Sequence, residues 1–295
     1  MPFDPAQLAA LAAVVGEGTF DAAARRLHVT PSAVSQRVKA LEGTVGRVLV
    51  RRTKPVLPTP SGEALLRLAR QYEALAADTL REIGGDESGS VTVPLAVNAD
   101  SIDTWLLPAL AAAGGADGRV VFDLRRDDQQ RTVELLRQGS VMAAVTSVRE
   151  PVGGCSAHRL GRMRYRVCAA PSTAARWFPD GPAADGFAHA PVVVYDRNDE
   201  LQDRYLRRRS RGRADPPRHH VPGSHAFAEA VRLGLGWGML PDQQSAHLLA
   251  SGDLVDLDPG RSLDVTLYWQ QWRLRSGVLD AVAGAVRDAA ATALV

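Results

Sequence analysis

The chain has 295 residues, of which 45% are hydrophobic and 23% are charged, and its formal net charge is +2. This length exceeds one ordinary hydrophobic core and predicts two or three domains. The composition is that of a globular protein, and no apolar run approaches the roughly 20 residues that cross a bilayer. Residues 1–4 have neither the basic start nor the apolar stretch of a signal peptide, so we expect a cytoplasmic protein with no membrane association.

Cysteines and histidines give no sign of a metal site. Cys155 and Cys168 lie too far apart for a metal-binding knuckle, and we interpret both as small apolar residues. His189, His219 and His220 lack ligand spacing. We therefore expect no metal and no cofactor.

The first 60 residues carry the clearest local pattern. Residues 5–15 predict an amphipathic helix, and Thr19 can cap a short second helix. Thr30-Pro31 then supplies the cap and the first-turn proline of a third helix, which runs to about Glu42. The expected buried residues of this third helix are Val34, Val38 and Leu41.

The opposite face of the third helix predicts contact with DNA. Its short polar side chains can enter a major groove, where Gln36 can reach a base edge. A strand and turn at 46–53 would bring two arginines to the DNA backbone or the minor groove. By pattern alone, a small helical domain with an exposed basic face is the alternative. The predicted DNA-contacting residues are Thr30, Ser32, Ser35, Gln36, Arg37, Lys39, Arg51 and Arg52.

These residues resemble the DNA-binding domain of the LysR-type transcriptional regulators. The matching stretches are Phe20-Asp21-Ala22-Ala23-Ala24-x-x-Leu27-x-Val29-Thr30-x-Ser32-Ala33-Val34-Ser35, Leu41-Glu42-x-x-Val45-Gly46, Arg51-Arg52-Thr53 and Thr59-Pro60-Ser61-Gly62. The resemblance implies a winged helix-turn-helix over residues 1–60 that binds specific double-stranded promoter DNA.

Residues 61–84 predict one long linker helix, with Ser61 as its cap. A narrow apolar stripe is typical of a seam between two helices, although it also fits packing on the helix's own domain. The stripe consists of Leu65, Leu68, Tyr72, Leu75 and Leu80. The resemblance implies the seam, and with it a homodimer or homotetramer through the linker helix and the effector domains. Residues 84–90 are rich in glycine and serine and predict a flexible hinge.

From Val91 onward, expected strands and helices alternate, which indicates parallel α/β units. Two stretches, Leu160–Ala169 and Leu263–Arg273, cross between two lobes. We expect strands at 91–97, 119–124, 141–146, 192–195, 219–221 and 237–240, and helices near 104–113, 129–138, 199–209, 225–233 and 276–293.

The predicted fold is therefore α/β with an α-rich N-terminal domain. A winged helix-turn-helix and a linker helix precede a two-lobed effector-binding domain, like the periplasmic binding proteins, over residues 90–295. We expect lobe one at about 90–161 and 267–295, and lobe two at about 162–266.

The carboxyl ends of the strands predict a ligand cleft. Helix starts and hydroxyls there suit a carboxylate, and aspartates suit an ammonium or guanidinium group. Any single aspartate is more commonly a helix cap or a solvated turn, so the hypothesis depends on their convergence. The predicted effector-binding residues are Asn98, Asp100, Ser101, Asp123, Thr146, Ser147, Asp196, Asp199 and Ser224.

Residues 91–295 resemble the ArgP/LysG group of the same family, which senses basic amino acids and controls an amino-acid exporter. The matching stretches are 95–101, 104–105, 151–155, 160–165, 233–241 and 268–270. The resemblance implies an activator or repressor that responds to lysine or arginine, with RNA polymerase as a further partner. The segment Gly223–His225 differs from the segments richer in threonine and glutamate that other members of this group have at the same helix start. The choice of effector is therefore left open.

Other function classes remain as alternatives. A transport binding protein would need a signal sequence. An α/β small-molecule-binding enzyme would need a nucleophile and base or a cofactor loop, and Gly234-x-Gly236 before a strand is no dinucleotide fingerprint, so we expect no enzyme. An architectural DNA-binding protein is the third alternative, because members of the group include inhibitors of replication initiation.

Overall fold

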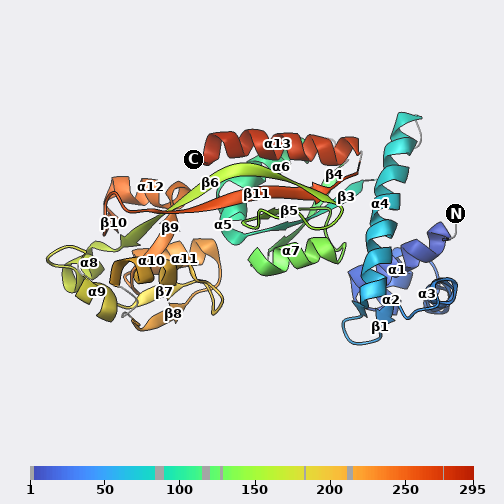
Figure 1. Cartoon of the computed structure of the whole chain (residues 1–295), viewed down its shortest axis with the longest axis horizontal. Coiled ribbons are helices and arrows are strands. Elements are labelled where there is room, and N and C mark those ends of the chain that lie inside the picture. Colours follow the sequence, from blue (N-terminus) through green and yellow to red (C-terminus); the bar gives the residue numbers. More distant parts are fainter. Residues whose placement is uncertain are drawn as a thin grey trace. The chain divides into compact units, whose positions relative to one another are not determined.

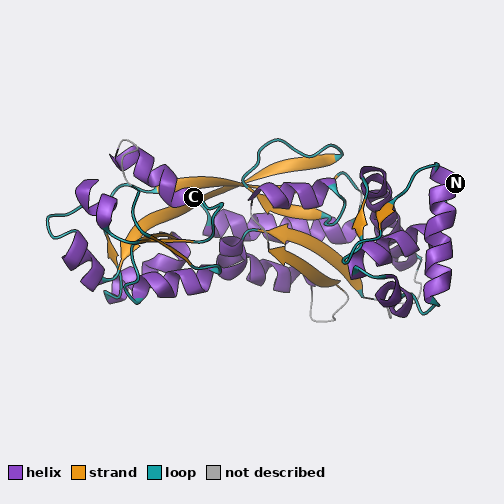
Figure 2. Ribbon diagram, turned by 90° about the horizontal axis from the view of Figure 1, so that it is seen from below, coloured by secondary structure: helices purple, strands orange, loops and turns teal. Residues whose placement is uncertain are grey.

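The computed structural model shows two compact units that mix helices and strands (Figures 1 and 2). The first unit comprises Met1–Val97, Leu110–His158 and Trp269–Ala285; the second comprises Asn98–Ala109, Arg159–Tyr268 and Val286–Val295. The structure describes residues 3–83, 90–114, 120–126, 129–182, 184–210, 215–274 and 276–295. The predicted hinge at 84–90 lies outside the described residues except for Ser90.

The N-terminal part of the first unit is a bundle of helices, drawn in blue in Figure 1. The first three are α1 (Pro5–Glu17), α2 (Phe20–Arg26) and α3 (Pro31–Val45). The Thr19 hydroxyl accepts a hydrogen bond from the Ala22 amide (3.1 Å), and the Thr30 hydroxyl accepts one from the Ala33 amide (3.2 Å). Both predicted caps are therefore confirmed.

One hydrophobic core holds these helices together. The predicted residues Val34, Val38 and Leu41 of α3 are all fully buried. The same core contains Leu8 and Leu11 of α1. The 3.6-residue period of α3 places its three apolar residues on one face, and the polar residues between them remain outside.

A short hairpin follows α3. Strand β1 (Val50–Arg51) pairs antiparallel with β2 (Leu57–Pro58) to form the wing. The predicted strand at 46–53 begins too early, because Gly46 instead ends α3 in the left-handed conformation at φ 70°. The Glu42 carboxylate accepts a hydrogen bond from the Leu49 amide (2.8 Å), which ties the end of α3 to the wing.

The long helix α4 (Pro60–Glu82) starts one residue before its predicted cap. The Thr59 hydroxyl accepts from the Gly62 amide (3.1 Å) and donates to the Val48 carbonyl (2.7 Å), so Thr59 is the cap and Ser61 is not. A Cβ on Gly62 would lie 1.9 Å from the Leu49 carbonyl oxygen. The Thr-x-x-Gly spacing therefore lets α4 cross directly against the wing.

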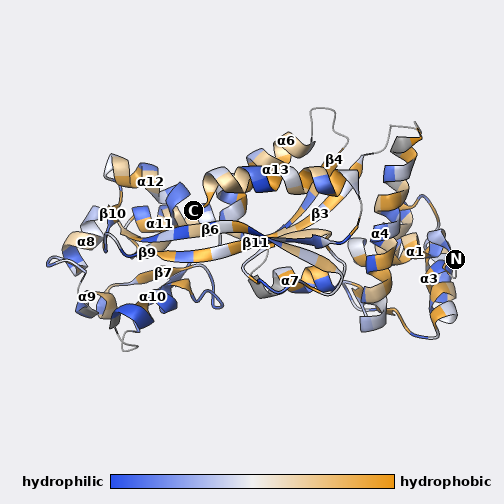
Figure 3. Cartoon of the chain, turned by 45° about the horizontal axis from the view of Figure 1, so that its top comes forward, coloured by the Kyte–Doolittle hydropathy of each residue, from blue (hydrophilic) through white to orange (hydrophobic). Residues whose placement is uncertain are grey.

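The two halves of α4 have different surroundings. Leu65 and Leu66 are buried in the core of the N-terminal helices, so packing on its own domain is confirmed for the first half. The exposed fraction rises to 43% at Leu75, 55% at Leu80 and 73% at Ile83, just past the helix end. Figure 3 shows apolar residues recurring along α4 into these last turns. This exposed C-terminal stripe has no partner within the described chain.

The sheet of the first unit is parallel at its centre. Strand β3 (Val91–Val97) lies between β4 (Val120–Arg126) and β5 (Ala143–Thr146) and is parallel to both. Helix α7 (Gln129–Arg137) packs on β3 and β5. The expected range 91–97 is confirmed, whereas β4 continues past the expected end at Leu124. The chain reaches the second unit through α5 (Ala99–Ser101), the five-residue π-helix η1 (Ile102–Leu106) and the start of α6 (Leu107–Gly114).

Two long strands continue from one unit into the other. They are β6 (Cys155–Ala169) and β11 (Leu263–Trp272), at the two stretches expected to cross between lobes. Strands β9 (Gly238–Pro241) and β10 (Val255–Asp256) pair antiparallel with β6. The expectation of parallel α/β units therefore does not extend to the pairing of β9 and β10 with β6, which is antiparallel.

The second unit also contains a parallel pair, β7 (Val192–Val194) and β8 (Arg218–His220). Its core combines Phe227, Val231 and Leu240 with a cluster of aromatic rings around Trp237. The sequence pattern predicted neither α8, α9 nor α12, which are short and rich in alanine or polar residues. The remaining helices are α8 (Pro171–Trp177), α9 (Ala184–His189), α10 (Leu201–Ser210), α11 (Ser224–Arg232), α12 (Asp242–Ser251) and α13 (Gly277–Ala293).

Both cysteines are free and buried. Burial raises the pKa of the Cys155 thiol to about 11 and that of Cys168 to about 12, which agrees with their interpretation as apolar residues.

The described residues contain no group of His, Cys, Asp and Glu side chains that could hold a metal ion. Within the same residues, every helix is too short or too polar to span a membrane.

Candidate functional site

The outer face of α3 is polar and accessible. Ser32, Gln36 and Lys39 are exposed and follow one another at spacings of four and three, so they share one face of the helix. Ser35 and Arg37 are half-buried beside them. Thr30, at the start of α3, uses its hydroxyl to cap the helix. Short side chains at the beginning of α3 leave room for a nucleic-acid groove.

The two predicted wing arginines are also exposed. Arg51 lies in β1, and the Arg52 guanidinium lies 5.2 Å from the centre of the Phe20 ring at the start of α2. This cation–π contact orients a charged group that otherwise projects from a loop. All eight predicted DNA-contacting residues thus belong to α3, its cap and the wing of one small domain.

A second polar cluster lies in the second unit, around the Asp100 carboxylate. Tyr165 of β6 donates its hydroxyl proton to Asp100 Oδ2 (2.7 Å). Ser224, the first residue of α11, donates to Asp100 Oδ1, and its hydroxyl oxygen accepts from Gln244 Nε2 of α12 (2.8 Å). Residues from β6 and α11 therefore meet at the Asp100 carboxylate, and α12 contacts it indirectly through Ser224.

Burial and neighbouring carboxylates both act on the pKa of Asp100. Burial raises the pKa of Asp100, the hydrogen bonds from Ser224 and Tyr165 lower it, and the carboxylates of Asp199 and Asp103 raise it again. Burial and the Asp100 charge also raise the pKa of Tyr165 well above its usual value, so this hydroxyl keeps its proton. The two charged groups that contribute most to this shift, Asp199 and Asp103, are both negative.

Asn98 carries an unsatisfied acceptor close to Asp100 in the sequence. It precedes α5 by one residue and stands two residues before Asp100, and its buried Oδ1 has no hydrogen-bond partner within the described chain. A buried acceptor without a donor is unfavourable, so a ligand that donates to Asn98 Oδ1 and carries positive charge toward Asp100 would suit this turn. An ammonium or a guanidinium group supplies both.

Three further predicted residues of the second unit have local structural partners. The buried Ser101 hydroxyl accepts from the Trp105 indole (3.2 Å). Asp199 accepts from the amides of Tyr195 and Leu201 (both 3.0 Å) at the start of α10, and burial raises its pKa. Asp196 accepts from a backbone amide two residues away in a tight turn. Asp199 is nevertheless close enough to act on the pKa of Asp100.

The other three predicted residues lie in the first unit. Asp123 was expected at the end of a strand. It lies instead within β4, where it pairs with Arg125 (3.1 Å). Thr146 ends β5, is buried, and accepts from the Val148 amide (3.2 Å); Ser147 follows it. The convergence of all nine predicted residues on one ligand therefore remains a prediction.

Comparison of the chain with models of known protein families identifies the class of protein. The family model "Bacterial regulatory helix-turn-helix protein, lysR family" matches residues 5–63, and the model "LysR substrate binding domain" matches residues 85–291. The chain belongs to the LysR family of transcriptional regulators. The fold predicted from the sequence, a winged helix-turn-helix before a LysR effector domain, is confirmed.

Similar LysR-family proteins cover nearly the whole chain. The lysine export transcriptional regulatory protein LysG of Corynebacterium efficiens is 44% identical over 292 residues, which cover 99% of each chain. ArgP from Mycobacterium tuberculosis has a crystal structure with a TM-score of 0.88 and 45% identity, covering 99% of this chain and 98% of that one. Full-length LysG from Corynebacterium glutamicum with bound effector Arg has a TM-score of 0.78 and 39% identity, covering 99% of each chain.

These relatives are regulators, so this LysR-family chain is a DNA-binding transcriptional regulator and not an enzyme.

Sequence reasoning missed two residues of the Asp100 cluster. Tyr165 stands in the stretch 160–165 that resembled the ArgP/LysG group, but no spacing connected it to Asp100. Gln244 lies in α12, a helix that the pattern did not predict. Only the fold brings these side chains together.

The Asp100 geometry predicts a pH dependence of stability. Between the usual pKa of 3.8 and the raised value, the folded chain keeps a proton that the unfolded chain has lost. The free energy of unfolding must then fall as pH rises through this window, and Asp100→Asn must remove that contribution. Urea unfolding of both proteins from about pH 4 to about pH 8 measures it. Parallel curves for the two proteins would contradict the raised pKa.

Proposed function

We propose that this LysR-family regulator senses a basic amino acid, lysine or arginine, at Asp100 and controls an amino-acid export gene. The observation that carries the proposal is the partly buried Asp100 carboxylate, whose hydrogen bonds within the described chain come from the neutral hydroxyls of Tyr165 and Ser224. A cationic side chain would balance its charge and favour its ionised form. The Arg effector bound to C. glutamicum LysG and the lysine-export function named for the C. efficiens relative support this ligand class.

The α-carboxylate of such an effector would bind at hydroxyls and helix starts. Thr146, Ser147 and Ser101 are the predicted residues of that type, with Asp196 and Asp199 as further partners for the effector's charged nitrogen atoms. Effector binding can change transcription only if its affinity differs between two arrangements of the regulator. A response to the amino acid therefore requires that the Asp100 site differ between those arrangements.

On the DNA side, α3 and the wing read the promoter. Ser35 and Gln36 are proposed to contact base edges, while Arg51 and Arg52 contact the backbone or minor groove. The exposed C-terminal stripe of α4 is proposed to pack against the same helix of a second copy, which gives a homodimer or homotetramer on a two-fold site. RNA polymerase is the proposed partner when the regulator activates transcription.

The effector proposal is tested by thermal unfolding of the full-length protein with each amino acid. Lysine or arginine should raise the melting temperature with saturation, whereas citrulline, which has the shape of arginine without its charge, should not. Asp100→Asn should weaken the response at least about tenfold, since it removes the buried charge partner. Asp180→Asn, at an exposed residue of the second unit, is the matched control. An equal response to citrulline refutes recognition of the cation.

The DNA proposal is tested with the double variant Ser35→Ala/Gln36→Ala. The variant should lose about 1–3 kcal/mol of promoter-binding free energy for each base contact that is removed. Its binding to random DNA should remain largely unchanged. Fluorescence anisotropy with both DNAs at matched salt separates the two effects. Equal loss on promoter and random DNA would argue against base recognition by these residues. A wild-type protein without promoter preference would favour the architectural alternative.

The dimer proposal is tested with Leu75→Glu/Leu80→Glu. Charges on the exposed stripe should produce monomers in sedimentation velocity while the fold is retained, because neither side chain belongs to the core of the chain. Leu57→Glu, at a wing residue with a similar exposed fraction of 42%, is the control and should keep the wild-type assembly. Intact dimers in the double variant would reject the stripe as the interface.

A further inference from the structure

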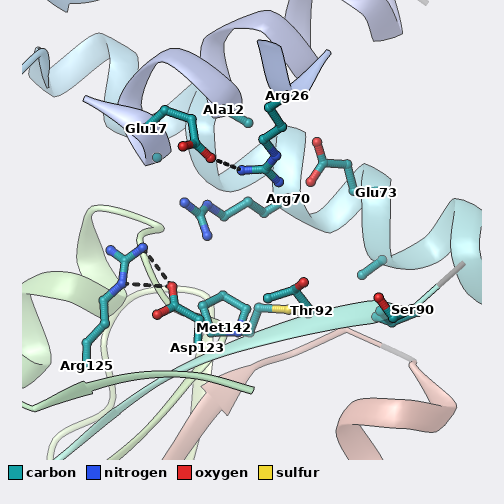
Figure 4. A pocket seen from close by; sticks show the side chains of 14 residues that line it. Ala12, Glu17, Arg26, Arg70, Glu73, Ser90, Thr92, Asp123, Arg125 and Met142 are labelled. Atoms are coloured by element: carbon teal, nitrogen blue, oxygen red, sulfur yellow. Dashed lines mark hydrogen bonds and ion pairs between the residues drawn. The ribbon is translucent and has the colours of Figure 1, made fainter. Parts of the chain in front are cut away.

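The first unit contains a pocket of about 350 Å³ that is separate from the Asp100 cluster. Its walls come from α1, α2 and α4 on one side and from β3 and β4 on the other (Figure 4). Three arginines from three different elements line it: Arg26 of α2, Arg70 of α4 and Arg125 of β4.

Two of these arginines already have partners in the pocket wall. Arg26 forms an ion pair with Glu17 (3.3 Å), and Arg125 forms one with Asp123 (3.1 Å). The two acids are therefore largely balanced by the arginine next to them. In Figure 4, the guanidinium of Arg70 extends into the space between these two pairs.

Arg70 differs from the other two. Its Nε is buried and has no hydrogen-bond partner within the described chain. Burial lowers the pKa of Arg70 to about 10, and the charges of Arg125 and Arg26 lower it as well, against opposing contributions from Glu73 and Asp123. An arginine with a lowered pKa is unusual, because this group otherwise stays protonated under all ordinary conditions.

The remaining acid, Glu73, does not satisfy Arg70. Burial raises the pKa of Glu73, while Arg70 and Arg26 lower it only in part. Glu73 is three residues from Arg70 on the same helix, yet the Arg70 Nε remains without an acceptor within the described chain. What the pocket lacks is thus a further acceptor with negative charge, placed between the three guanidinium groups.

We propose that this pocket is a second ligand site, which binds a small oxyanion, such as phosphate, sulfate or a carboxylate, on Arg70 with Arg26 and Arg125 beside it. The planar fork of an arginine matches the oxygen atoms of such a ligand. The pocket volume admits a small molecule of this class with its solvent. This site is separate from the proposed amino-acid site, since Asp100, Tyr165, Ser224 and Gln244 do not line the pocket.

A ligand here would contact both parts of the first unit. Arg26 and Arg70 belong to the helices that carry the winged helix-turn-helix, whereas Arg125 belongs to the sheet of the effector domain. The bound anion would therefore stabilise the packing of these helices on that sheet. Ligands that bind only the folded arrangement raise its stability in this way.

The test uses inorganic phosphate and the full-length protein without amino acids. Calorimetric titration and thermal unfolding should show a saturable effect of phosphate that sodium chloride at equal ionic strength does not produce. Arg70→Gln should weaken phosphate binding at least about tenfold, without lowering the melting temperature in chloride, because the buried Arg70 Nε has no hydrogen-bond partner within the described chain. Arg70→Lys keeps the charge without the planar fork and should also bind more weakly.

Arg25→Gln is the matched control, since Arg25 is an exposed neighbour of Arg26 on α2 and does not line the pocket. It should bind phosphate like the wild type. Parallel titrations with sulfate and acetate distinguish a tetrahedral oxyanion from a carboxylate as the preferred ligand. The proposal is overturned if chloride reproduces the phosphate effect, if Arg70→Gln binds as tightly as the wild type, or if none of the three anions binds.

Discussion

Burial of Leu65, Leu66 and Ala69 in the core of the N-terminal helices is the interaction on which the regulator depends. These side chains make the first half of α4 part of the DNA-binding domain and not a separate spacer. Thr59 and Gly62 fix the crossing point, because the hydroxyl caps the helix and the missing Cβ admits the Leu49 carbonyl. The orientation of the recognition helix α3 is therefore tied to the direction of α4.

Because the first half of α4 is fixed in this core, the position of its second half is fixed relative to the DNA-binding domain. Leu75 and Leu80 cannot reach the core that holds Leu65 and Leu66, so they remain exposed at the end of a helix whose beginning is fixed. If a second copy covers them, the separation of two recognition helices is set by α4 alone. Base reading and assembly then depend on a single element.

Two partly buried groups of opposite charge, one in each unit, lack an ion-pair partner among the described residues. Asp100 is a carboxylate among neutral donors and other carboxylates, and Arg70 is a guanidinium whose Nε has no partner within the described chain. Unpaired charge away from water is costly, and groups of this kind cluster at functional sites. The sign of each charge is the basis for the two proposed ligand classes, a cation at Asp100 and an anion at Arg70.

The sequence by itself determined the local elements of the DNA-binding domain. Caps such as Thr19 and Thr30, and the periodic burial of Val34, Val38 and Leu41, depend on neighbours within a few residues, which a linear pattern contains. It also placed Asp100 and Ser224 among the candidate residues. Only the tertiary structure joined them to Tyr165 and Gln244, showed Asp123 within β4 paired to Arg125, and divided α4 into a buried and an exposed half. The contacts around Asp100 join residues up to 124 positions apart, and no local spacing encodes such a distance.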